Sequence, residues 1–195
     1  MCGGCPYNRR EIKMELWDLY DKDRRPLGIT HERGKPIPAG AYHLSVHIAI
    51  FTPDGRMLVQ RRSPDKKHWG GLWDMSAAGS VLAGESSAAG AARELYEELG
   101  LTYDFSAMRP QFTINYKVGF GDVYVIEREV DLSEIEFHTD EVAEVGFMTY
   151  DEIIDSIRRG EFIPYYESFV SFLFDRRTTA ETMRDGFTGN TVPKQ

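Results

Sequence analysis

The sequence contains no hydrophobic segment long enough to cross a membrane. Its longest apolar runs, such as Ile-Ala-Ile-Phe at residues 48–51, span only a few positions, whereas a transmembrane helix needs about 20 apolar residues. The beginning of the chain also lacks the charged, apolar and small-residue parts of a secretory signal peptide. We therefore expect a cytoplasmic protein with no membrane partner.

Cysteine is nearly absent, because the 195 residues include only Cys2 and Cys5. The C-x-x-C spacing of this pair occurs in thioredoxin-like redox sites and in one half of a zinc site. The sequence predicts no βαβ unit around the pair and offers no second pair to complete four zinc ligands. We interpret both cysteines as part of a flexible N-terminal tail, residues 1–12, without a function of its own.

The chain also lacks an excess of positive charge, since 23 basic and 31 acidic residues give a net charge of −8. This balance argues against a protein that binds a nucleic acid polymer. It does not exclude small phosphorylated substrates, because a bound metal ion or a local basic cluster can reverse the local field. The length suits one domain, and a hydrophobic content of 42% is enough to form a core.

Several segments alternate apolar and polar residues, which predicts β-strands. Residues 14–34 favour a hairpin, and the segment 43–51 places its even-numbered apolar residues on one face. An Asp54-Gly55 turn then leads into a partner strand at residues 57–62. Further strands are predicted at residues 111–118, 122–130 and 141–148, with Gly-Phe-Gly at 119–121 separating the first two.

Three segments have the period of a helix: residues 86–99, 149–160 and 164–177. The first has an apolar stripe formed by Ala88, Ala92, Leu95 and Leu99. Ser86 or Ser87 can cap its start, and Gly100 can form a left-handed cap at its end. Gly90 lowers helix propensity, which suggests close packing at that position.

Strands before and after a central helix predict a mixed α/β fold rather than a helical bundle or a β-sandwich. We expect a single domain at residues 13–177 and a mobile C-terminal tail at residues 178–195.

The central helix carries an unusual concentration of acidic residues. Glu94, Glu97 and Glu98 lie within an arc of roughly 100°, opposite the apolar stripe, because each helical residue advances by about that angle. Arg93 can form an ion pair with Glu97 one turn later, but one pair does not neutralise three carboxylates. The arrangement predicts either a solvated face or a site for a hard divalent cation such as Mg²⁺.

A longer spacing favours the cation site. Gly79 is followed after five residues by Glu85, and after seven more by Arg93-Glu94, so that residues 79–101 follow the pattern G-x5-E-x7-R-E-U-x-E-E-x-G-U, where U is a bulky aliphatic residue. With every specified position met, the segment resembles the signature of the Nudix family.

The resemblance implies an α/β/α sandwich with a mixed β-sheet, in which the signature forms a loop, a helix and a loop. Most Nudix proteins are Mg²⁺- or Mn²⁺-dependent pyrophosphohydrolases that cleave a nucleoside diphosphate linked to another group. By position, Glu94, Glu97 and Glu98 would bind the metal together with the backbone carbonyl of Ala78. Gly79, Glu85 and Arg93 would shape the turn and orient these ligands.

Nudix sites often include a further acid from outside the signature helix. The segment before the last predicted strand offers Asp140, Glu141 and Glu144, and Glu141 is the first choice. The expected catalytic carboxylates are therefore Glu94, Glu98 and Glu141, with either Glu94 or Glu141 acting on the attacking water.

The residues before the signature resemble the branch that contains isopentenyl-diphosphate isomerase and related hydrolases. This region holds the densest basic cluster of the chain, and the substrate-binding candidates are Arg61, Arg62, Lys66, Lys67 and His43. Solvent-facing side chains are the alternative interpretation for the lysines and for at least one arginine.

An isomerase is the main alternative to a hydrolase. By the same resemblance, the catalytic cysteine of the isomerases falls at Ala78 and one of their metal-binding histidines at Ser80. His43 aligns with another ligand, and His31 does so only approximately. Because alanine cannot transfer a proton and the signature glutamates are complete, we favour hydrolysis of a small diphosphate compound.

A ligand-binding module without catalytic activity is the third hypothesis, although such modules typically lose signature glutamates. The sequence also allows a homodimer, for which the N-terminal hairpin and the helix that starts near residue 164 offer surfaces.

Overall fold

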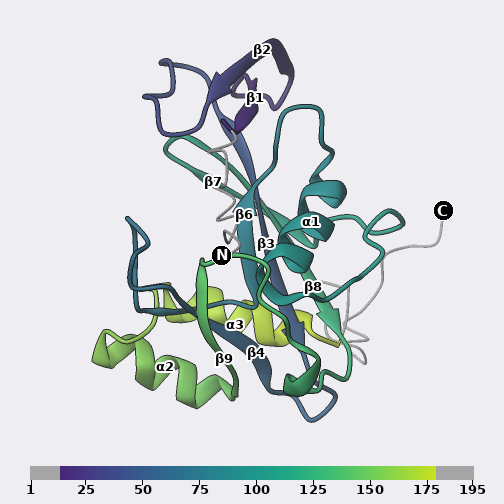
Figure 1. Ribbon diagram of the computed structural model, residues 1–195, viewed down its shortest axis with the longest axis vertical. Coiled ribbons are helices and arrows are strands. Elements are labelled where there is room, and N and C mark those ends of the chain that lie inside the picture. Colours follow the sequence, from purple (N-terminus) through teal and green to yellow (C-terminus); the bar gives the residue numbers. More distant parts are fainter. Residues whose placement is uncertain (1–13, 179–195) are drawn as a thin grey trace, which may run out of the picture.

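The computed structural model describes residues 14–178. The two cysteines and both predicted tails, apart from residue 178, lie outside these residues. Within this part of the chain, a seven-stranded mixed sheet lies between helices, and a separate two-stranded hairpin stands at one end (Figure 1).

The strands of the main sheet follow the order β5-β4-β3-β8-β7, with β6 also paired to β3 and β9 paired to β4. Only β3 and β8 are parallel, and the other pairs are antiparallel. The strands are β3 (His43–Phe51), β4 (Met57–Arg62), β5 (Trp73–Asp74), β6 (Ala77–Ser80), β7 (Phe112–Tyr116), β8 (Gly119–Glu127) and β9 (Val142–Met148).

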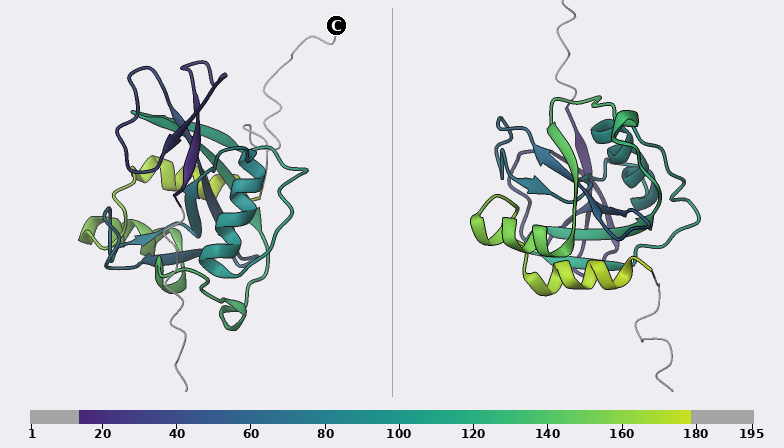
Figure 2. Two further views of the ribbon diagram at one scale, coloured as in Figure 1. Left: turned by 45° about the horizontal axis from the view of Figure 1, so that its top comes forward. Right: turned by 90° about the horizontal axis from the view of Figure 1, so that it is seen from below.

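The central strand β3 is buried on both faces, because helices cover both sides of the sheet. Its even-numbered residues join a core with α1 (Ser87–Leu99), as their alternation predicts. Ala49 and Phe51 join a second core with α2 (Tyr150–Arg159) and α3 (Glu167–Arg176). Figure 2 shows α1 on one side of the sheet and the other two helices on the opposite side.

The ends of α1 confirm the predicted caps. The Ser86 side chain accepts a hydrogen bond from the backbone N–H of Ala89, and Gly100 adopts the left-handed conformation with φ of 69°. Close packing at Gly90 is confirmed too, since a Cβ there would lie 2.9 Å from a methyl carbon of Val81. These features bring the helix onto the loop that follows β6.

The predicted N-terminal hairpin consists of β1 (Leu16–Tyr20) and β2 (Pro26–Glu32). Arg24 in its turn reaches the sheet and forms a forked ion pair with Asp122 of β8, with one N–O distance of 2.8 Å. The Asp122 side chain is fully buried and also accepts a hydrogen bond from Thr113. The hairpin is therefore attached to the sheet by an ion pair with a buried carboxylate.

Two predicted boundaries are wrong. The Gly-Phe-Gly segment at 119–121 belongs to β8 and does not separate two strands. Its glycines are needed because a Cβ at Gly119 would lie 2.6 Å from the carbonyl oxygen of His43, and one at Gly121 would lie 3.0 Å from His47. The last helix begins at Glu167 rather than near residue 164.

Candidate active site

Glu98 is the most deeply buried carboxylate of the signature helix, with only 2% of the residue exposed. One carboxylate oxygen accepts hydrogen bonds from the Gln60 amide at 2.8 Å and from the backbone N–H of Ala78 at 2.9 Å. Burial, and secondly the charge of Glu94, raise the pKa of Glu98 to about 8, although these two hydrogen bonds oppose the shift. The protein holds this carboxylate in place while removing it from water.

Glu94 lies directly over Gly79 of β6. A Cβ at Gly79 would come within 2.0 Å of the Glu94 carboxyl carbon, so only glycine leaves room for this side chain. Burial raises the pKa of Glu94 to about 7, whereas the neighbouring Arg93 lowers it. The glycine that opens the signature therefore allows the acidic helix to approach the strand.

Arg93 connects three of the four glutamates of the signature. Its guanidinium donates to Glu85 at 2.8 Å, to Glu94 at 2.9 Å and to Glu97 at 2.8 Å, and it also reaches the Ser80 carbonyl at 2.8 Å. The predicted ion pair one turn apart is confirmed. Burial opposes ionisation of Glu85, but the hydrogen bonds from Arg93 and a backbone N–H lower its pKa overall.

The solvated-face hypothesis is wrong for two of the three helix glutamates. Glu94 and Glu98 are buried, and the Glu97 side chain alone is substantially exposed, at 41%. Crowded, buried carboxylates with raised pKa values are costly to ionise unless a cation joins them. This is the expected condition of a cation site in a protein without its metal.

The donor set fits a hard divalent cation that retains water. Within residues 14–178, no three His, Cys, Asp or Glu side chains meet as a complete metal-binding group. Mg²⁺ does not require such a group, because it commonly binds one or two carboxylates and completes its shell with water and substrate phosphate. Glu98 and Glu94 are two buried carboxylates at the junction of α1 and β6, and their chemistry fits such a cation.

Glu141 precedes β9 and pairs with the Lys66 ammonium. Burial alone would raise the pKa of Glu141, but the hydrogen bond from Lys66 and the nearby Arg33 and Arg62 charges lower it overall. Its charge also contributes to the raised pKa of Glu94, so the two carboxylates influence each other. Glu141 therefore stays ionised beside the helix glutamates.

The other basic candidates are held in different surroundings. Arg62 is mostly buried and lies 3.4 Å from Asp74, which also accepts a hydrogen bond from Tyr165 at 2.8 Å. Arg61 is half-exposed, contacts the Gly71 carbonyl and faces Glu144 across the strand pair. The Lys67 side chain is exposed.

A model of the NUDIX domain matches residues 41–167. The chain belongs to the Nudix family. It is 43% identical over 162 residues to an uncharacterized Nudix hydrolase of Listeria innocua, which covers 83% of this chain and 95% of that protein. It is 31% identical over 144 residues to isopentenyl-diphosphate Delta-isomerase of Pectobacterium atrosepticum, which covers 69% of this chain and 76% of the isomerase.

The Nudix fold is confirmed by solved structures. A crystal structure of a Deinococcus radiodurans protein matches 82% of this chain and 97% of its own, with a TM-score of 0.64 at 21% identity. The predicted α/β/α sandwich with a mixed sheet is thus correct, and the chain is an enzyme of the Nudix hydrolase class. No helix within residues 14–178 is long and apolar enough to span a membrane.

The two histidines relevant to the isomerase branch have partners other than the signature glutamates. His43 stacks on Trp17 with ring centroids 4.3 Å apart, and its Nε2 lies 3.1 Å from the Tyr116 hydroxyl. Burial lowers the pKa of His43 to about 4, so the ring is neutral at pH 7. His31 in β2 contacts the Lys35 carbonyl at 3.1 Å.

Two residues that the sequence does not single out contribute to the site. Gln60 follows three apolar residues in β4, and no feature of the sequence distinguishes it from the two arginines that come after it. Arg33 follows β2 and binds Glu15 at 2.5 Å. Burial alone would lower the pKa of Arg33, but Glu15 and the charges of Glu141 and Glu94 raise it. The hairpin therefore brings the positive charge of Arg33 toward these carboxylates.

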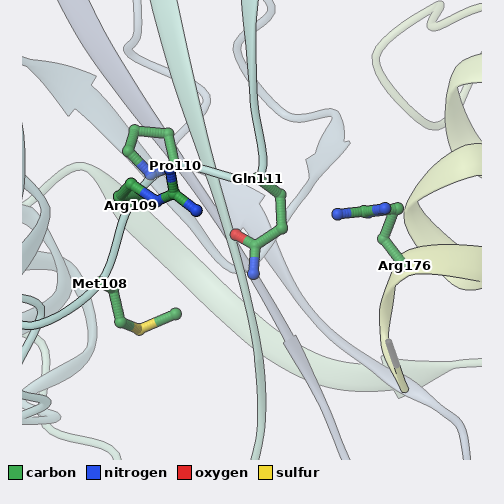
Figure 3. Close-up of a pocket in the computed structure, with 5 residues that line it drawn as sticks. All are labelled: Met108, Arg109, Pro110, Gln111 and Arg176. Carbon is green, nitrogen blue, oxygen red and sulfur yellow. The ribbon is translucent and has the colours of Figure 1, made fainter. Parts of the chain in front are cut away.

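Cavities described in the structure lie elsewhere. One of about 450 Å³ separates the segment before β7 from the end of α3 (Figure 3), and its lining consists of Met108, Arg109, Pro110, Gln111 and Arg176. None of these lining residues is among the hydrogen-bond or ion-pair partners of Glu94, Glu98 or Glu141. We do not assign it to the reaction.

Proposed function

We propose that the protein hydrolyses a diphosphate linkage in a small molecule with the aid of Mg²⁺ or Mn²⁺. The observation that carries this proposal is the buried pair Glu94 and Glu98, held by residues from two different strands and one helix. Bound there, the cation would neutralise phosphate charge and lower the pKa of a water molecule.

The protein's own residues have separate roles in this proposal. Gln60 and the Ala78 N–H orient Glu98 from one side, and the Ala78 carbonyl is proposed as a further metal ligand. Arg93 fixes Glu94 and Glu97 and ties them to Glu85. These contacts keep the proposed oxygen ligands in place before substrate arrives.

Glu141 is the proposed general base. Its lowered pKa keeps it able to accept a proton at neutral pH, and Lys66 holds its carboxylate. The proton would leave the attacking water as its oxygen bonds to phosphorus and the bridging P–O bond breaks. Glu94 is the alternative residue for orienting that water.

The basic residues around Glu141 are proposed to receive substrate phosphate. Lys66 pairs with this carboxylate, and the charges of Lys66 and Arg62 both lower its pKa. Lys67 and Arg61 are exposed near them and remain candidates, as does His43 through its neutral ring.

Isomerisation of isopentenyl diphosphate is the second candidate, favoured by the relationship to the Pectobacterium isomerase. The side chains at Ala78 and Ser80 argue against it, since they provide neither the thiol nor the imidazole expected at those positions. A non-catalytic module is disfavoured because the carboxylates are held together by the contacts of Arg93.

The decisive experiment tests a panel of diphosphate compounds with and without Mg²⁺ or Mn²⁺. We expect a phosphorylated product only with metal, and we expect Glu98→Gln to lower kcat/KM by roughly a hundredfold or more. Full activity of this variant would contradict the site. Formation of the allylic isomer from isopentenyl diphosphate would instead establish the isomerase alternative.

A further inference from the structure

Asp74 in β5 links Arg62 to a residue far along the chain. Only 2% of Asp74 is exposed, and one of its carboxylate oxygens accepts hydrogen bonds from the Tyr165 hydroxyl and the Met75 backbone N–H, both at 2.8 Å. The other oxygen faces Nη1 of Arg62 at 3.4 Å. Burial raises the pKa of Asp74, and the hydrogen bond from Tyr165 is the strongest of the contacts that oppose this rise. The hydroxyl therefore favours the ionised carboxylate that attracts Arg62.

Tyr165 is held in place by the segment between α2 and α3. This segment pairs with β5, because the Trp73 N–H donates to the Glu161 carbonyl and the Ile163 N–H donates to the Trp73 carbonyl, both at 2.9 Å. Burial, and secondly the Asp74 charge, raise the pKa of Tyr165 well above its usual value. The hydroxyl thus keeps the proton that it donates, and the paired backbone fixes its position.

The Arg62 guanidinium keeps a buried donor without an acceptor. Its side chain is 14% exposed, and within residues 14–178 its buried Nε has no hydrogen-bond partner. Arg24, by contrast, binds the buried Asp122 through a forked contact. A buried N–H without an acceptor costs free energy, and an oxygen atom of a ligand would remove that cost. Arg62 therefore contacts Asp74 at one end and leaves Nε for another group.

This donor belongs to the charged cluster around the proposed general base. The charge of Arg62 lowers the pKa of Glu141. The next residue, Ser63, donates its backbone N–H to the Glu141 carbonyl at 2.8 Å, and Lys66 pairs with the Glu141 carboxylate. The charge of Glu141 in turn contributes to the raised pKa of Glu94. Arg62 is thus connected through Glu141 to the glutamates of the signature helix.

We propose that Tyr165 and Asp74 are positioning residues that hold the Nη1 end of Arg62, so that its Nε edge binds an oxygen of the substrate diphosphate. This inference rests on the proposed function and adds two residues outside the signature to it. In a guanidinium, Nε and one Nη form a fork that fits two phosphate oxygens. Because a long side chain loses conformational freedom when a ligand orders it, residues that order it beforehand raise the affinity. The segment between α2 and α3 thereby aids substrate binding without touching the substrate.

A double-mutant cycle separates positioning from a general loss of stability. Tyr165→Phe removes only the hydroxyl, and Arg62→Lys keeps the charge but loses the planar fork. The probe is methylenediphosphonate with Mg²⁺, whose P–C–P bridge water does not cleave, and its affinity is measured by calorimetry. Tyr166→Phe is the matched control, because Tyr166 is the next residue and is 85% exposed. Thermal unfolding of each variant checks that it is folded.

We expect Tyr165→Phe to weaken binding of the probe about fivefold and Arg62→Lys about tenfold or more, because each removes a contact of a charged group. In the Arg62→Lys background, Tyr165→Phe should weaken binding by no more than about twofold, since the side chain that it positions is already lost. Asp74→Asn should behave like Tyr165→Phe, and Tyr166→Phe should keep the wild-type affinity. In hydrolysis, Tyr165→Phe should raise KM and leave kcat nearly unchanged.

Two results would overturn the inference. One is wild-type affinity in Tyr165→Phe, and the other is the same loss with and without Arg62→Lys, because the hydroxyl would then not act through Arg62. The probe is not cleaved, so binding is tested separately from turnover. Coupled losses without hydrolysis of any diphosphate compound would reject the proposed function and leave this contact standing, whereas hydrolysis with independent losses would reject the inference alone.

Discussion

Gly79→Ala is the sharpest test of how the signature works. A single methyl group would be placed 2.0 Å from the Glu94 carboxyl carbon and 2.1 Å from one of its oxygens, where ordinary contact begins near 3.4 Å. Glu94 would have to move by at least about 1 Å, a displacement that can lower catalysis on the order of a hundredfold. Crowding should also lower the free energy of unfolding by about 1–3 kcal/mol.

The assay measures metal-dependent kcat/KM and thermal unfolding of the same preparations. The backbone of Gly79 is not in the left-handed region, so alanine changes the space rather than the conformation. Gly146→Ala is the matched control, because its Cβ would lie 3.8 Å from Trp73 and should leave activity unchanged. Gly90→Ala is intermediate, since the 2.9 Å contact with Val81 is offset by a gain in helix propensity of about 1 kcal/mol. Wild-type kcat/KM in Gly79→Ala would refute the reasoning.

Three further predictions concern charge. Because the pKa of Glu98 rises from 4.5 to about 8 on folding, the metal-free native state binds the extra proton between these values. The free energy of unfolding of the metal-free protein should therefore fall as pH rises from about 4.5 to about 8. In Glu98→Gln, the melting temperature measured in a chelator should depend less on pH. An unchanged pH dependence would contradict the burial of this carboxylate. Arg93→Lys should lower kcat/KM about 10- to 100-fold, because one ammonium cannot reproduce the forked contacts, and near-normal kinetics would count against that role. Arg24→Ala should lower the free energy of unfolding in urea by about 3 kcal/mol by leaving Asp122 buried without its cation, whereas an unchanged midpoint would mean that the hairpin attachment adds no stability.

Local features of the fold were predictable because they depend on residues close together in sequence. The caps at Ser86 and Gly100 and the ion pair between Arg93 and Glu97 each involve residues within one or two helical turns. The same holds for the turn at Asp54-Gly55. Such patterns carry their physical cause within a short window.

Contacts between distant segments were not predictable in this way. Gln60 meets Glu98 across 38 residues, and Arg24 meets Asp122 across 98. The Gly-Phe-Gly segment resembles a turn in sequence, but its glycines are required by the neighbouring strand and by side chains that pack over β8. Packing of distant strands therefore decides what local composition leaves ambiguous.

The candidate active site shows the same difference between local patterns, which are predictable, and contacts between distant segments, which are not. The signature spacing identifies the helix glutamates through its resemblance to a family, but it does not predict that Glu94 and Glu98 are buried while Glu97 stays half-exposed. Burial depends on how closely α1 approaches β6, and that distance is set by the missing side chain at Gly79.

The parallel pairing of β3 with β8 has a consequence for the order of events during synthesis. The register joins residue 43 to 119 and residue 51 to 127, and the entire signature lies between these two strands in sequence. The core beneath α1 includes Phe120 and Tyr124 of β8. A growing chain that has emerged only as far as residue 101 therefore has every signature residue but lacks the strand that closes the core. We expect such a chain to contain the motif without the buried carboxylates, so that cation binding begins only after β8 has left the ribosome.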